Sequence, residues 1–528
     1  MENALTREQL QTLNKTDLID MIMNQTAQLK ELNQNLSILI EEVAALRSDK
    51  FGRKSEAGLV DEDQLRIFNE VEGLFDPDAE EEDIETVVRA HVRRRKGKLE
   101  EDLSNFPVKE VIHELSEEEL KAEFPNGFSR LPDEIYKKLE YHPSWHEVLE
   151  HHIAVYKDKA GDKIIKADHP AELLDHSIVT PSLAAAIING KYTNAMPLYR
   201  IEQEFARNDV NISRQTMANW MMRLSERYLS LVYDRIKQEI KQSSVIHADE
   251  TPVMVTKDGR EGMHKNYMWV YRTGEMCKAK PAILYEYQRG RSQEYPREFL
   301  KGFKGKLVCD GYNVYHNIEA DEEFTVCGCW AHARRYFADA VKAAGKDNAK
   351  GTLAYAALVQ IANMFKIEES LQKLPPSKRK ERRKDMIGPL VDSFFDWLKA
   401  NETNAVPKTK TGKGFTYCLN QETYLREFLK DPQVPMDNNA AERAIRGFCV
   451  GKNNWHLIDT VNGAKASAVL YSIIETCKAN HLKIYEYLKY LLTEIPQHMD
   501  DTSLDFLDDL LPWSDKLPTE CRKVIDGK

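Results

Sequence analysis

Four short apolar runs constrain the fold of this chain more than any other feature of its sequence. They cover residues 245–249, 267–271, 282–285 and 306–310. Runs of this length, rich in β-branched and aromatic residues and bounded by glycine or charged turns, are typical of β-strands. A helical pattern over residues 293–300 separates the third run from the fourth. We therefore expect an α/β fold in which three strands, a helix and a fourth strand build a mixed sheet.

Two of these runs end in an acid, Asp249 and Asp310, 61 residues apart in the sequence. A carboxylate at the end of a strand emerges into the crevice at the edge of a sheet. Mg²⁺ binds few protein carboxylates and takes phosphate oxygens and water as its other ligands, so two or three acids can build a phosphoryl-transfer site. In a two-metal site, one ion activates the attacking oxygen and the other stabilises the leaving oxygen. Alone, an Asp after a strand is more often a turn or cap residue.

A third acid, Glu442, lies in the string Met-Asp-Asn-Asn-Ala-Ala-Glu-Arg-Ala-Ile-Arg over residues 436–446. Asp437 or Asn438 can cap a helix that carries Glu442 one turn in. Arg443 and Arg446 lie nearby, as phosphate clamps beside a metal ligand would. Glu442 and Arg446 are equally an ordinary i,i+4 surface ion pair, so spacing alone leaves both readings open.

A second candidate metal cluster is Cys327, Cys329 and His332, which offers soft or borderline ligands. Cys327 and Cys329 have one residue between them, and such a string alone is a weak signal for a metal site. We therefore do not expect Cys327, Cys329 and His332 to form a metal site. All eight cysteines lie at or after Cys277 with uneven spacing, which predicts reduced thiols.

A candidate DNA-binding unit precedes the strands. Residues 198–206 have the pattern of one helix, Asn208-Asp209 of a turn, and Ser213 of the N-cap of a second helix over residues 214–224. This is helix-turn-helix spacing, and the second helix would present Arg214, Gln215 and Asn219 outward to a major groove. A helical hairpin that only packs on its neighbours has the same pattern.

The N-terminal region has the spacing of a short coiled coil, which predicts a homo-oligomer. Apolar residues step by three and four at Leu29, Leu32, Leu36, Leu39, Val43 and Leu46. A helix packed on its own domain is the alternative. The net charge of −11 excludes a uniformly basic coat, but residues 91–98 and 378–384 are local basic runs, either DNA-facing or simply solvated. No apolar stretch reaches membrane-spanning length, so we expect a cytoplasmic, nucleoid-associated protein.

Four strings in this chain closely resemble DDE transposases of the insertion sequence sixty-six family, the TnpC type. They are His-Ala-Asp-Glu-Thr at 247–251, Cys-Asp-Gly-Tyr at 309–312, Cys-Trp-Ala-His-Ala-Arg-Arg at 329–335 and Asp-Asn-Asn-Ala-Ala-Glu-Arg-Ala-Ile-Arg at 437–446. The likeness implies a ribonuclease-H-like (retroviral integrase) core in which Asp249, Asp310 and Glu442 bind Mg²⁺ or Mn²⁺, two ions in all. It also implies DNA contacts by His332, Arg334, Arg335, Arg443 and Arg446. The partners would be the inverted ends of an element, target DNA and accessory proteins of the same element.

One departure from the family concerns zinc. Family members usually carry Cys-x-x-Cys pairs before the helix-turn-helix region, whereas no cysteine precedes Cys277 here, so we expect no zinc ion. The expected organisation is a coiled coil (1–50), a linker (51–104), a degenerate zinc-finger-like module (105–175), a helix-turn-helix region (176–240), a catalytic core (241–337 and 430–460), a helical insertion (338–429) and a C-terminal helical region (461–528). Two other functions remain open: an inactive regulatory derivative of a transposase, and a ribonuclease-H-like repair nuclease.

Overall fold

The computed structural model describes residues 15–29, 146–157, 164–167, 172–262, 264–345 and 349–523. Contacts divide the chain into two units, Met1–Arg53 with Ala171–Lys523 and Lys54–Pro170 with Val524–Lys528. In the first unit, residues 15–29 form a helix. In the second, strands β1 (Val155–Lys157) and β2 (Ile164–Lys166) pair antiparallel. The predicted coiled-coil seam lies outside the described residues except for Leu29, as do the predicted linker and most of the cysteine-free module.

The first unit is built on a mixed sheet of six strands. Five of them lie in the order β5-β4-β3-β6-β7, and β8 pairs separately with β3. Strands β3, β4 and β5 are antiparallel neighbours, whereas β6 and β8 run parallel to β3 and β7 runs parallel to β6. The bounds are β3 Val245–Lys257, β4 Lys265–Thr273, β5 Ile283–Gln288, β6 Lys306–Val308, β7 Thr325–Cys327 and β8 Ile458–Thr460. Helix α10 (Glu294–Leu300) separates β5 from β6, so the predicted α/β order is confirmed.

Side chains alternate between the two faces of this sheet. Asp249 of β3 stands opposite Val270 of β4, which in turn stands opposite Tyr285 of β5. On this face, the Tyr285 hydroxyl donates to the Ala444 carbonyl of α18 (Asn439–Trp455) at 2.7 Å. On the other face, the Tyr271 ring stacks on Phe299 of α10 with centroids 3.5 Å apart. Both faces are therefore covered by helices, and Asp249 lies on the α18 side.

Two of the helices before the sheet are the predicted pair. In chain order, the helices there are α6 (Pro181–Ile188), α7 (Leu198–Arg207), α8 (Arg214–Leu224) and α9 (Ser230–Gln242). Ser213 is the N-cap of α8, because its hydroxyl accepts the Thr216 N–H at 3.1 Å. Asp209 in the preceding turn has a φ of 59°. The predicted helix pair and its cap are confirmed.

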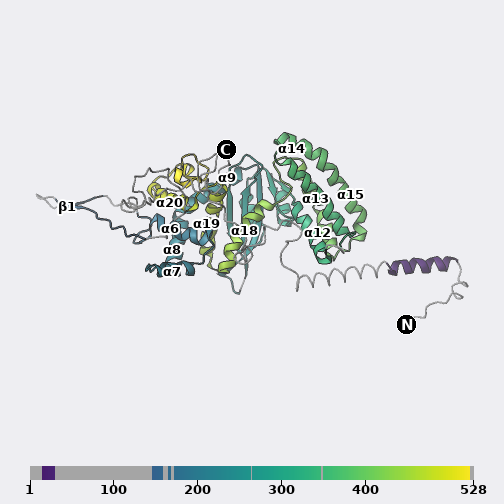
Figure 1. Ribbon diagram of the computed structural model, residues 1–528, viewed down its shortest axis with the longest axis horizontal. Coiled ribbons are helices and arrows are strands. Elements are labelled where there is room, and N and C mark those ends of the chain that lie inside the picture. Colours follow the sequence, from purple (N-terminus) through teal and green to yellow (C-terminus); the bar gives the residue numbers. More distant parts are fainter. Residues whose placement is uncertain are drawn as a thin grey trace, which may run out of the picture. The chain divides into compact units, whose positions relative to one another are not determined.

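The segment between β7 and α18 is helical, as predicted, and Figure 1 shows its helices gathered together beside the sheet. They are α12 (Trp330–Ala344), α13 (Leu353–Leu371), α14 (Pro376–Arg382), α15 (Gly388–Asn401), α16 (Lys410–Asn420) and α17 (Glu422–Leu425). Helix α16 begins within residues 408–414, although the lysines and glycines of this stretch are more typical of a loop. Its two glycines serve close packing: a Cβ on Gly412 would lie 1.9 Å from the Val406 carbonyl oxygen, and one on Gly414 2.8 Å from the Phe337 ring.

The C-terminal helices α19 (Val461–Ala479) and α20 (Ile484–Glu494) complete the unit. Helix α19 lies along the outer edge of β5. The Tyr285 N–H donates to the Ser472 hydroxyl at 2.8 Å, and the Ile283 N–H donates to the Thr476 hydroxyl at 3.0 Å. Helix side chains thus satisfy the main-chain groups that an edge strand leaves free. No helix within the described ranges is long and apolar enough to cross a membrane.

Candidate active site

The strand register brings Asp249 and Asp310 to the same place in the sheet. The parallel pairing of β3 with β6 ends at His247 opposite Val308, and each acid lies two residues beyond that pair. Strand β8 joins the same edge of β3 only from Val255 onward. Asp249 therefore lies where β6 has ended and β8 has not yet begun. The prediction that Asp249 ends its strand is wrong, because β3 continues to Lys257 and it is β6 that stops.

Glu442 reaches the site from the first turn of α18. Arg335 of α12 donates from Nη2 to both carboxylate oxygens of Glu442, at 3.1 and 3.2 Å. His332 Nδ1 lies 3.7 Å from Glu442 Oε1. Glu442 therefore pairs across two helices with Arg335, not with Arg446 one turn along its own helix. Of the predicted DNA contacts, the structure brings His332 and Arg335 to the third acid.

A buried amide fixes α18 to β3. Asn438, fully buried, donates from Nδ2 to the Ala248 carbonyl at 2.9 Å, and its Oδ1 lies 2.8 Å from His247 Nδ1. Its main-chain N–H donates to Cys329 Sγ at 3.2 Å. Of the two residues expected to cap the helix, Asn438 occupies the N-cap position but uses its amide across the fold, whereas Asp437 accepts the Asn439 N–H at 3.0 Å. Sequence reasoning missed these bonds from Asn438 to Ala248 and His247, which form a latch between α18 and β3.

Burial and the charges of neighbouring acids raise the pKa of Asp249. The pKa of Asp249 rises to about 8, first through burial and then through the charges of Glu250, Asp310 and Glu442. Asp310 and Glu442 are thus close enough to Asp249 for their charges to affect its pKa. Burial, followed by the charge of Arg335, lowers the pKa of His332. The site therefore concentrates negative charge that a cation would relieve.

The donor set suits a hard divalent cation, because carboxylate oxygens are the ligands that Mg²⁺ and Mn²⁺ prefer. Within the described part of the chain, no three His, Cys, Asp or Glu side chains are arranged as a ready metal-binding group. Asp249 Oδ1 accepts the Glu250 N–H at 2.8 Å, and Asp310 Oδ1 accepts the Tyr312 N–H at 3.0 Å. The chemistry of the donors fits such an ion. In this structure, however, the two aspartates accept bonds from main-chain N–H groups, and Glu442 accepts bonds from Arg335.

Glu250, the residue next to Asp249, forms a second cluster that sequence reasoning missed. Arg291 donates from Nε to Glu250 Oε1 at 2.6 Å, and its guanidinium lies 3.7 Å from the centroid of the Tyr312 ring. Burial and the charge of Asp310 raise the pKa of Glu250 to about 7, against the opposing effect of Arg291. Because alternate residues of a strand face opposite ways, Glu250 lies across the sheet from Asp249. Glu250 and Tyr312 both belong to the strings that carry the family resemblance, which is the signal that could have found them.

The other residues predicted to contact DNA form no hydrogen bond or ion pair with Asp249, Asp310 or Glu442 in the described part of the chain. Arg443 pairs with Glu275 at 2.9 Å, Arg446 is exposed and Arg334 is half-buried. On α8, the predicted outward residues Arg214, Gln215 and Asn219 are all exposed, and Gln215 donates to Asn219 at 3.1 Å. Their outward position is confirmed, whereas groove binding stays a prediction.

Only some of the basic side chains in residues 378–384 are exposed at the protein surface. Lys378, Lys380, Arg382 and Lys384 are exposed, but Arg379 and Arg383 are buried. The interpretation of the run as a uniform solvated or DNA-facing face is wrong for these two residues, which bond main-chain carbonyls inside the helical segment. Two of its cations therefore serve the fold.

Replacement of Asp249 by Asn is expected to stabilise the protein in EDTA. The folded-state pKa of about 8 lies above that of the unfolded chain, so the contribution of Asp249 to stability is fully present near pH 4 and is lost as pH rises toward 8. The variant should gain on the order of 5 kcal/mol at pH 8 and little or nothing at pH 4. Chemical denaturation at both pH values measures this. Equal gains at pH 4 and 8 would contradict the electrostatic explanation.

Comparisons with known proteins agree with this architecture. A family model described as "Transposase IS66 family" matches residues 176–466. Two others, "IS66 C-terminal element" and "Transposase C of IS166 homeodomain", match residues 472–513 and 38–111. The sheet and helices described above thus carry the matched region of a transposase, a DNA-binding protein of an insertion sequence. More narrowly, the chain belongs to the IS66 family of transposases.

Its relatives include proteins of Sinorhizobium fredii (strain NBRC 101917 / NGR234). The uncharacterized protein y4qI is 27% identical over 419 residues, which span 77% of this chain and 76% of the relative. The uncharacterized protein y4hP is 27% identical over 399 residues, which span 73% and 71%. The family resemblance of the motif strings is confirmed.

Proposed function

We propose that Asp249, Asp310 and Glu442 hold two divalent ions, Mg²⁺ or Mn²⁺, for DNA strand cleavage and strand transfer at the ends of an insertion element. The register carries this proposal: both aspartates lie two residues beyond the last β3–β6 pair. Glu442 raises the pKa of Asp249 from the facing helix. The ions would supply an activated water or 3′-hydroxyl and a stabilised leaving oxygen.

The protein's own residues would position the DNA for this chemistry. The Arg335 guanidinium is 48% exposed, so it can turn from Glu442 to a phosphate without crossing the core. Arginine binds either group through the same planar fork. His332, on the same helix, lies beside Glu442. These two residues would bind the scissile strand once cations neutralise the acids.

The rest of the molecule supports wider proposals. The mixed sheet order β5-β4-β3-β6-β7 supports a ribonuclease-H-like core, which the family resemblance implies. The exposed face of α8 would bind the inverted ends, and the N-terminal helix would oligomerise the protein. The domain boundaries, the accessory proteins and the nucleoid location stay predictions.

Purified protein should nick element-end DNA and join the exposed 3′-ends to target DNA when Mg²⁺ or Mn²⁺ is added. It should also protect the inverted ends from cleavage in a footprint. Binding should weaken steeply with salt, because phosphate contacts release counterions. End protection without nicking would indicate an inactive regulatory derivative. Metal-dependent cleavage without end-specific protection would indicate a repair nuclease instead.

A further inference from the structure

The helical segment between β7 and α18 contains an arginine that is buried inside the protein, away from its charged surface. Arg383 is fully buried at the start of the π-helical turn η4 (Arg383–Ile387). Its Nε and Nη2 donate to Glu368 of α13 at 2.9 and 2.5 Å. A buried ion pair seldom stabilises a fold more than apolar residues of the same size would, so its presence calls for a more specific reason.

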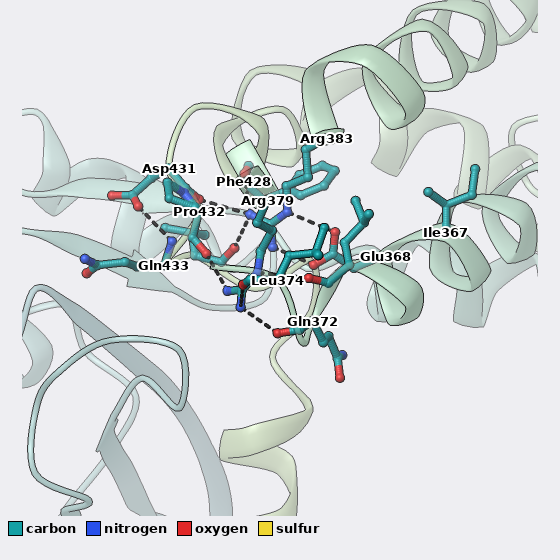
Figure 2. Close-up of polar contacts among 12 residues, drawn as sticks. Ile367, Glu368, Gln372, Leu374, Arg379, Arg383, Phe428, Asp431, Pro432 and Gln433 are labelled. Carbon is teal, nitrogen blue, oxygen red and sulfur yellow. Dashed lines mark hydrogen bonds and ion pairs between the residues drawn. The ribbon is translucent and has the colours of Figure 1, made fainter. Parts of the chain in front are cut away.

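The other end of the guanidinium holds a loop. Arg383 Nη1 donates to the main-chain carbonyls of Phe428, Asp431 and Val434, at 2.8, 3.0 and 2.9 Å. Arg379, also buried, donates from Nη1 to the Pro432 carbonyl at 2.9 Å. Figure 2 shows the two arginines between Glu368 and this loop. Four carbonyls within residues 428–434 are thereby fixed to α14 and η4.

This loop leads directly to the third acid. Two residues on, the Met436 carbonyl accepts the Trp330 N–H of α12 at 3.0 Å. Asn438 then bonds the Ala248 carbonyl of β3, and Glu442 follows in the first turn of α18. The backbone is thus held at short intervals from Phe428 to Asn438, first by the helical segment and then by the sheet.

We infer that Arg383, with Glu368 and Arg379, is a positioning residue: it fixes the 428–434 loop so that α18 presents Glu442 to Asp249 and Asp310. This inference rests on the proposed function of the three acids. It gives the helical segment a catalytic purpose, namely to set the place of the one acid that the sheet does not carry. Arg383 itself bonds only Glu368 and main-chain carbonyls of the loop.

The test is Arg383→Lys in the full chain. Lysine keeps a cation beside Glu368, but a compact ammonium cannot replace a rigid fork that bonds the carboxylate and three carbonyls together. We expect a 10- to 100-fold lower single-turnover nicking rate, since small misplacements of a reacting group cost about this much. Affinity for end DNA should stay within about twofold, the Mg²⁺ concentration for half-maximal rate should rise, and amide exchange should increase at 428–442.

Arg426→Lys is the matched control. Arg426 lies in the same helical segment, but its side chain bonds the carboxylates of Asp392 and Glu422, which lysine can still pair with. It should nick at the wild-type rate. If Arg383→Lys does not fold, Arg379→Lys carries the same test through the Pro432 carbonyl.

The outcomes separate this inference from the function on which it rests. Wild-type protein without metal-dependent nicking overturns the proposed function. If the wild-type protein nicks DNA and Arg383→Lys and Arg379→Lys each nick within twofold of its rate, the positioning role alone is overturned. An equal fall in DNA affinity and rate, with no local change in exchange, overturns it as well, because the arginine would then act through the whole fold.

Discussion

Replacing any one of Asp249, Asp310 and Glu442 by alanine should abolish metal-dependent nicking and strand transfer, with a rate loss on the order of 10³ or more. In the proposed site each variant removes one of the three carboxylates that would hold the cations, two of which affect the pKa of the third. Affinity for end DNA measured without metal should stay the same or rise, because each variant also removes a charge that repels phosphate. Gel-based cleavage and binding assays measure both quantities.

A matched control for these variants is Asp459→Ala. Asp459 is an exposed carboxylate of β8, paired with Lys257 of β3 at 2.8 Å, so it lies on the same sheet but outside the site. Exposed ion pairs contribute little to stability. The control should cleave at the wild-type rate. Full activity in any of the three alanine variants would remove that acid from the site.

Asn438→Ala should have the second largest effect, on stability and activity together. The variant leaves the Ala248 carbonyl without its donor and His247 Nδ1 without its partner, both in the core. Each buried group left unpaired costs about 1–3 kcal/mol, so we expect a loss of about 2–5 kcal/mol in unfolding free energy. Nicking should fall even below the unfolding transition, because α18 loses its bond to the strand that carries Asp249. Urea denaturation and single-turnover assays measure the two effects.

The comparison variant is Asn454→Ala, on the same helix. Its amide donates to the Ala195 carbonyl at 2.9 Å in an exposed setting, where water can replace it. The loss should be below about 1 kcal/mol. If Asn438→Ala is no more destabilising than Asn454→Ala, the latch between α18 and β3 does not hold the site together.

Local patterns predicted the secondary structure well where the signal lies within a few residues. The four apolar runs became β3, β4, β5 and β6 in the expected order, and Ser213 caps α8 as its hydroxyl and position indicated. Local patterns identified each acid as a candidate site residue, but only the resemblance of the motif strings to a family placed the three acids in one site. The strand register then gave a physical reason for Asp249 and Asp310 to lie together.

Contacts between distant segments could not be predicted. Asn438 reads as a cap in sequence, yet its amide bonds a strand 190 residues earlier. Arg379 and Arg383 belong to a run that reads as surface, and Gly412 reads as a loop residue although it lies within a helix. For Asn438, Arg379 and Arg383, a partner far away in the chain decides the role of a residue whose type permits several roles.

The hydroxyls of α19 along β5 have a consequence for assembly. Thr476 also returns a bond to the strand, because its hydroxyl donates to the Ile283 carbonyl at 2.8 Å, and the Tyr285 carbonyl accepts from the Tyr233 hydroxyl at 3.0 Å. A second copy therefore cannot extend the sheet at Ile283 and Tyr285, because the main-chain groups with which it would pair are already bonded. This part of the sheet border is thereby protected from fibril-like growth.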